Sequence, residues 1–152
     1  MMLAIIPPTP GLSMWLSSTA QNALQAVLYL AEHGGSAPVN VGDVAVALGV
    51  PKNYLSKTLH ILAREGILLS TRGPRGGFVL ADAPGTLTLA RVVRPFVASS
   101  ARRCLVGRAT CNDATPCAAH HQWSRVAASV ETFFGHTTIA DLLRSAPSPQ
   151  PA

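Results

Sequence analysis

The stretch PKNYLSKTLHILAREGILLSTRGPRGGFVL, residues 51–80, decides the fold of this chain. It begins with Pro51, which suits the first turn of a helix, and leucines then recur at helical spacing until a glycine ends the pattern. The apolar face of this predicted helix comprises Leu55, Leu59, Leu62 and Ala63. Two short strands, 67–71 and 78–80, follow around the turn RGPRGG, which predicts a β-hairpin directly behind the helix.

A shorter helix is predicted just before this segment, over NVGDVAVALGV (40–50). Val44, Ala45 and Leu48 share one of its faces, and Gly49 ends it. Two short helices joined by a tight turn that contains glycine form a helix-turn-helix, and a hairpin directly behind such a pair is a wing. The sequence therefore predicts a winged helix-turn-helix.

Further helices are expected on both sides of this unit. Ser17 and Ser18 offer the cap of a first helix that ends at Gly34, and its apolar stripe comprises Leu24, Val27, Leu28 and Ala31. Behind the hairpin, Thr86 or Thr88 caps a helix over about 88–98, in which Pro95 should force a kink. A long helix over about 118–134 carries the stripe Val126, Val130, Phe133 and Phe134, and a last short helix capped by Thr137 or Thr138 runs through Leu143.

Positive charge gathers on the second helix and on the wing. Between Lys52 and Gly76 there are five basic side chains and one acidic side chain, a local net charge of 5 − 1 = +4. The N-terminal end of a recognition helix meets base edges and phosphates, and a glycine-rich wing lets the backbone approach DNA closely. The candidate DNA contacts are Lys52, Asn53, Tyr54, Ser56 and Lys57 on the helix and Arg72, Gly73 and Arg75 in the wing.

A solvated basic face is the simpler interpretation of any single one of these residues. The ordered series of helix, turn, helix and basic hairpin favours DNA instead. A nucleotide-binding loop is unlike this pattern, because RGPRGG lacks the G-x-x-x-x-G-K-[ST] spacing and precedes a strand rather than a helix.

Composition is typical of one globular domain with short tails. Of the 152 residues, 48% are hydrophobic and 12% are charged, which excludes a disordered chain, and the net charge of +5 suits an anionic partner. No run reaches the roughly 18 apolar residues that a membrane-spanning helix needs. We therefore expect a cytoplasmic protein with no membrane partner, in which the ends, 1–13 and 145–152, are disordered and Met14 is a possible natural start.

All three cysteines fall in CLVGRATCNDATPCAAHHQW, residues 104–123. An odd number of cysteines excludes a closed disulfide framework. Structural zinc sites pair their cysteines as C-x2–4-C, whereas gaps of six and five residues form a longer loop that fits an iron–sulfur cluster better. The candidate ligands are Cys104, Cys111, Cys117 and His120, which lies one helical turn after the third cysteine.

Other interpretations of the cysteines remain open. Zinc held by the three cysteines and His120 is the second, a Cys104–Cys117 disulfide switch is the third, and chance proximity is the least specific. An electron-transfer protein or a metal-dependent enzyme is a rival, but Asp113 is the one carboxylate inside the loop, so no acid–base constellation accompanies the thiols. A cluster-free protein-interaction module on a winged helix is a further rival.

Together these motifs resemble a known family, the winged-helix regulators typified by IscR and NsrR (the Rrf family). The resemblance covers about residues 14–143. MWLSSTAQNALQAVLYLA (14–31) is similar to the family's first helix, and NYLSKTLHILAREGILLSTRGPRGGFVL (53–80) is similar to its recognition helix and wing. C-x6-C-x5-C, the following H-x2-W and TTIADLL (137–143) resemble its cluster loop, dimer helix and C-terminal end.

The resemblance implies a mainly helical fold with a small β-hairpin wing and a long C-terminal dimerisation helix. It implies a homodimer whose helices over 118–134 cross, and a 2Fe–2S or 4Fe–4S cluster held by the three cysteines. IscR-like members take the fourth ligand from a histidine that His120 matches, whereas NsrR-like members use an acidic residue where this chain has Gln21. This departure favours His120, while the longer first cysteine gap leaves the nuclearity open.

We expect a DNA-binding transcriptional regulator, a repressor rather than an enzyme, that senses iron–sulfur status, redox state or nitric oxide through its cluster. Its operator is expected to be an imperfect palindrome in double-stranded DNA, bound less tightly as salt rises. The expected divisions are a winged helix-turn-helix domain (14–83), a connecting helix (84–103), a cluster-binding loop (104–117) and a dimerisation segment (118–144) between the two tails.

Overall fold

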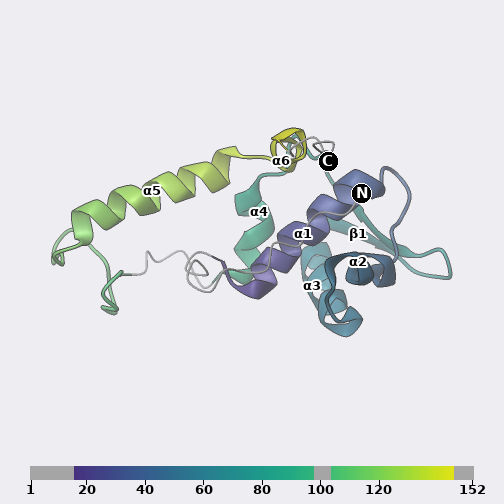
Figure 1. Cartoon of the computed structure of the whole chain (residues 1–152), viewed down its shortest axis with the longest axis horizontal. Helices are drawn as coiled ribbons and strands as arrows, with labels where there is room; N and C mark the ends of the chain where they lie inside the picture. Colours follow the sequence, from purple (N-terminus) through teal and green to yellow (C-terminus); the bar gives the residue numbers. More distant parts are fainter. Residues whose placement is uncertain (1–15, 98–103, 146–152) are drawn as a thin grey trace, which may run out of the picture.

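The computed structural model describes residues 16–97 and 104–145 (Figure 1). Its elements are α1 (Ser18–His33), α2 (Val41–Leu48), α3 (Lys52–Arg64), β1 (Leu68–Thr71), β2 (Gly77–Leu80), α4 (Leu89–Val93), the 3-10 helix η1 (Arg94–Phe96), α5 (His120–His136) and α6 (Ile139–Ser145). The predicted class, mainly helical with a two-stranded antiparallel hairpin, is confirmed. The expected tail 1–13 and residues 146–152 of the other tail lie outside the described residues, whereas Ser145 belongs to α6.

A compact body surrounds α1, which runs through its middle with α2 and α3 on one side and α4 and α6 on the other (Figure 1). The core side chains come from every element of this body. They include Val27 and Leu30 of α1, Leu55, Leu59 and Leu62 of α3, Val92 of α4 and Ile139 of α6. Parts of the chain that are far apart in the sequence therefore share one core, since α6, which follows α5, packs against α1.

Helix α1 differs in detail from its predicted stripe. Ser17 caps it as expected, since the Ser17 hydroxyl accepts a bond from the Ala20 N–H at 3.2 Å. However, the fully buried residues are Ala20, Ala23, Ala26, Val27 and Leu30, whereas Leu24, Leu28 and Ala31 are only partly buried. Because α1 contacts α2, α3, α4 and α6, small alanines on several sides let its neighbours approach closely.

The wing is attached to the segment between α1 and α2. Strand β1 pairs with β2 in antiparallel register, from Leu68 opposite Leu80 to Thr71 opposite Gly77. Val39 then pairs with Phe78 on the other edge, through bonds of 3.0 and 2.9 Å between their backbones. A Cβ atom at Gly77 would lie 2.1 Å from the Val39 carbonyl oxygen, so this close approach requires glycine.

In the described part of the kinked helix expected over about 88–98 there are instead two short helices, and residues 98–103 of the expected connecting helix (84–103) lie outside the described residues. Thr88 caps α4, accepting a bond from the Arg91 N–H at 3.3 Å, and α4 ends at Val93. A 3-10 helix then carries Pro95. Proline has no N–H to bond the carbonyl four residues earlier, so the α-helix ends rather than bends.

Helix α5 projects from the body and carries the cysteine segment at its far end (Figure 1). It begins at His120 rather than near 118, because the residues after Cys117 form a turn closed by a 3.0 Å bond from the His120 N–H to the Cys117 carbonyl. Only His120 and Ala127 are buried along α5, and in the predicted stripe Val126 and Phe133 are 47% and 52% exposed. Over the described ranges, no helix is long and apolar enough to cross a membrane.

Candidate metal centre and nucleic-acid interface

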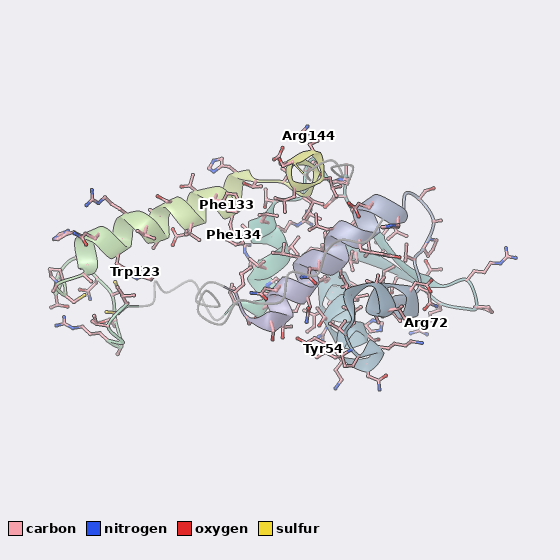
Figure 2. All side chains as sticks on the ribbon, in the orientation of Figure 1. Tyr54, Arg72, Trp123, Phe133, Phe134 and Arg144 are labelled. Carbon is pink, nitrogen blue, oxygen red and sulfur yellow. The ribbon has the colours of Figure 1, made fainter. Side chains whose placement is uncertain are left out.

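The predicted DNA-facing residues lie on α3 and in the wing. Lys52, Asn53 and Lys57 of α3 are exposed, and so are Arg72, Gly73 and Arg75 in the hairpin loop, while Ser56 is half-buried. Figure 2 shows Tyr54 on α3 and Arg72 in the wing on the side of the body away from α5. The leucines of α3 face the core, so the opposite, polar face of the helix is exposed to solvent near its N-terminal end.

Tyr54 is half-buried and differs from its neighbours on α3. Its hydroxyl lies 2.5 Å from the hydroxyl of Thr19, on the first turn of α1. Its backbone carbonyl accepts a bond from the Thr58 hydroxyl at 3.3 Å. Tyr54 therefore connects the N-terminal end of α3 to α1.

The cysteine segment brings its candidate ligands together as two pairs. The Cys104 and Cys117 sulfurs are 4.0 Å apart, and the Cys111 sulfur lies 3.5 Å from Nδ1 of His120. Two sulfurs bound to one tetrahedral metal at about 2.3 Å lie roughly 3.8 Å apart. Each pair therefore has the spacing of two ligands on one metal.

A single ion held by all four residues fits this arrangement less well. Within 16–97 and 104–145, no three His, Cys, Asp or Glu side chains are grouped so as to hold one metal ion. Cysteine thiolates, replaced by histidine in some centres, are the ligands of iron–sulfur clusters.

His120 is fixed at the first turn of α5. Its side chain is 2% exposed, and its Nε2 atom lies 2.7 Å from Oδ1 of Asp113 in the preceding loop. Nδ1 is therefore the ring nitrogen on the side of Cys111. The adjacent His121 is exposed, with its ring edge-on to that of His120.

The environment of Cys104 favours its thiolate. The backbone N–H of Arg108 is the main cause that lowers the pKa of Cys104, followed by the backbone of Val106, the Cys117 thiol and the Arg108 charge. The Arg108 guanidinium also donates to the Thr115 carbonyl at 3.2 Å, which connects the two halves of the loop. A thiolate is the form of cysteine that binds metals and attacks disulfides.

No sequence pattern assigns Asp113 or Arg108 to the site. In the sequence Asp113 is an isolated carboxylate, and no spacing rule links it to a histidine seven residues later. Gln21 lines a groove of about 530 Å³ together with Leu16 and the Val126 to Phe134 side of α5.

Comparison with known proteins places the chain among regulators. The profile of the Rrf2 family, described as an iron-dependent transcriptional regulator, matches residues 16–145. The chain belongs to the Rrf2 family. A protein of Aquifex aeolicus named as an HTH-type transcriptional regulator is 35% identical over 133 residues, 86% of this chain and 92% of that protein.

Relatives and solved structures agree with the Rrf2 assignment. IscR of Vibrio atlanticus is 29% identical over 86% of this chain and 76% of its own length. The structure of T. potens IscR superposes with a TM-score of 0.69 at 27% identity, over 90% of this chain and 91% of that chain. CymR, the global cysteine regulator of B. subtilis, has the same fold, with a TM-score of 0.75 at 22% identity over 87% and 98%.

Rrf2 proteins are DNA-binding transcriptional regulators rather than enzymes. The family resemblance of the motifs, the winged-helix fold and the prediction of a non-enzymatic regulator are therefore confirmed.

Proposed function

We propose that this Rrf2 protein is a cytoplasmic repressor whose operator affinity depends on an iron–sulfur cluster held by Cys104, Cys111, Cys117 and His120. The observation that carries the proposal is the arrangement of these four donors as two pairs at the far end of α5. The membership in a family described as iron-dependent and the similarity to IscR proteins support it.

The paired donors favour a 2Fe–2S cluster over a 4Fe–4S cluster or zinc. In a 2Fe–2S cluster each iron takes two protein ligands, so Cys104 and Cys117 would hold one iron and Cys111 and His120 the other. A structural zinc ion would need all four donors around one centre. When bound, the cluster would supply a group that accepts or releases an electron and that oxidants or nitric oxide can attack.

The residues around α5 would transmit a change in the loop to the body. Where α5 meets α6, the backbone N–H of Leu89 donates to the Thr137 carbonyl and that of Ile139 donates to the Leu87 carbonyl, both at 2.9 Å. These bonds connect the end of α5 to the start of α4, which packs on α1. A tilt of α5 is therefore expected to reach α1, and α3 through the contact between Thr19 and Tyr54.

DNA reading would require two copies of the chain. The exposed apolar face of α5, with Val126 and Phe133, continues into the groove beside the N-terminal end of α1. Figure 2 shows Phe133 and Phe134 at the end of α5 nearest the body. Burial of this face in a homodimer would place two α3 helices on two half-sites of an imperfect palindrome, with the wing arginines on the phosphate backbone.

A thiol switch without a cluster is the second candidate. The observation that favours it is the 4.0 Å separation of the Cys104 and Cys117 sulfurs, together with the lowered pKa of Cys104. A disulfide requires these sulfurs to close to about 2.05 Å, which a small movement of the loop can provide.

The two candidates separate on anaerobic purification of the full chain. A cluster gives a brown protein with visible absorption and about two irons and two sulfides per chain, and His120→Ala changes the spectrum or speeds cluster loss. Operator fragments should then bind with different affinity before and after the cluster is removed. A colourless protein with stoichiometric zinc, or one in which only a Cys104–Cys117 disulfide changes DNA binding, would overturn the cluster proposal.

A further inference from the structure

We propose that Asp113 is a positioning residue that fixes the ring of His120, so that Nδ1 is the nitrogen presented to the cluster. This inference rests on the proposed function, and it adds a residue that lies outside the donor set. Its basis is the contact of 2.7 Å between Oδ1 of Asp113 and Nε2 of His120, on the side of the ring opposite to Cys111.

The chemistry of the two groups decides which ring nitrogen carries the proton. An ionised carboxylate can only accept hydrogen bonds, so Nε2 of His120 must donate to Asp113. In the neutral ring this leaves the lone pair on Nδ1, which lies 3.5 Å from the Cys111 sulfur. Histidine ligands of metals commonly donate their other ring N–H to a carboxylate, which sets the tautomer and the ring orientation.

Burial makes the contact selective for one ring orientation. The His120 side chain is 2% exposed, whereas that of Asp113 is 95% exposed. The ring is therefore held in a confined space, and the carboxylate reaches it from solvent. Truncating Asp113 leaves no cavity, so its loss should affect the ring more than the fold.

The neighbouring residue separates ring positioning from loop shape. The side-chain oxygen of Asn112 accepts bonds from the Thr115 backbone N–H at 2.9 Å and from the Thr115 hydroxyl at 3.0 Å. Asn112 therefore shapes the turn through bonds that do not involve the contact between Asp113 and His120. Asn112→Ala is thus a matched control that disturbs the same loop without removing the carboxylate.

The first experiment needs no cluster. Ring-15N-labelled histidine in the cluster-free full chain, observed by NMR at a pH where the ring is neutral, should show the Nε2-protonated form at His120. Asp113→Ala should lose this preference, whereas Asn112→Ala should retain it. An Nδ1-protonated ring in the wild type, or an unchanged ring in Asp113→Ala, would overturn the inference.

The second experiment uses the cluster-loaded protein. Loss of such an outer carboxylate typically weakens metal binding by roughly 10–100-fold, so Asp113→Ala should release iron to a chelator faster by about that factor. The pulsed EPR nitrogen coupling of the reduced cluster should also change, and Asp113→Asn, whose amide oxygen still accepts from Nε2, should restore part of both properties. Equal effects of Asn112→Ala and Asp113→Ala would reduce Asp113 to a loop residue.

The two proposals fail in different ways. If the wild-type protein contains no iron, the cluster proposal fails, but the NMR measurement of the His120 tautomer still tests the role of Asp113. A wild-type protein with a cluster whose spectrum and lability are unchanged in Asp113→Ala overturns the positioning role alone.

Discussion

The body and α5 differ in how far their apolar side chains are buried. In the body, Leu55, Leu59 and Leu62 of the single helix α3 are fully buried, and α3 packs against α1, α2 and β1. In α5, which is longer, only His120 and Ala127 are buried, and Val126 and Phe133 stay about half exposed. A domain that already has its own core does not need a second apolar face for stability, and the proposed function assigns the face on α5 to the contact between two copies of the chain.

Phe133→Asp tests this contrast with the largest expected effect. A charge in the centre of an apolar interface should weaken the dimer by about 2 kcal/mol or more, which is roughly 30-fold in the dissociation constant. Sedimentation should show monomers, while the melting of the body measured at low protein concentration is unchanged. Ala128→Asp, on the opposite side of α5, is the control; a dimer that survives Phe133→Asp contradicts the interface.

A double variant, Lys57→Ala with Arg72→Ala, tests the body. Loss of these contacts should cost about 1–3 kcal/mol of operator binding and reduce the salt slope by about 1 for each phosphate contact removed. Arg125→Ala removes an exposed charge from α5 instead and should leave both quantities unchanged. Equal weakening by the two variants, seen in binding titrations over a range of salt, would show that general charge rather than this face attracts DNA.

The smallest predicted effect is on thermal stability, and it concerns Asp141 of α6, close to the point where α5 meets the body. The pKa of Asp141 is lowered, chiefly by the backbone N–H of Thr138 and then by the Thr138 hydroxyl and Arg144. The pKa of Asp141 is lower in the folded protein than in the unfolded chain, so the ionised carboxylate stabilises the fold. This stabilisation is complete above the ordinary pKa of about 3.9 and is lost as pH falls through the folded value. Asp141→Asn should therefore lower the melting temperature near neutral pH, and the difference should vanish in acid.

A melting difference that is constant with pH would exclude this carboxylate as the titrating group. The variant should leave the spectrum of the proposed cluster unchanged, because Asp141 lies beyond the end of α5 that is opposite to His120.

Local patterns in the sequence predicted most of the elements. Helix caps such as Ser17 and Thr88, and the glycines of the wing, act through neighbours in the chain, so their roles follow from sequence. The alanine face of α1 could not be found in this way, because alanine becomes a core residue only where several helices approach at once. Pro95 predicts a disruption of the helix, but whether the helix bends or ends there depends on the surrounding structure.

The candidate site was predictable as a set of residues but not as an arrangement. The spacing of the cysteines and His120 indicated the four donors. Their division into two pairs depends on how the loop folds back, which closes Cys104 onto Cys117 and Cys111 onto His120. Asp113 carries no pattern of its own, and its role depends on a contact across the turn.

The length of α5 determines how far a displacement at the cysteine loop would rotate this helix where it meets the body. Its 17 residues rise about 1.5 Å each, so the helix acts as a lever of about 26 Å between the loop and the α4–α6 junction. By this geometry, a displacement of about 1 Å at the loop turns the lever by only roughly 2° at the junction. Under the proposed function, collapse or rearrangement of the whole loop would therefore reach the body, whereas a small displacement of one proposed ligand would turn α5 too little to do so.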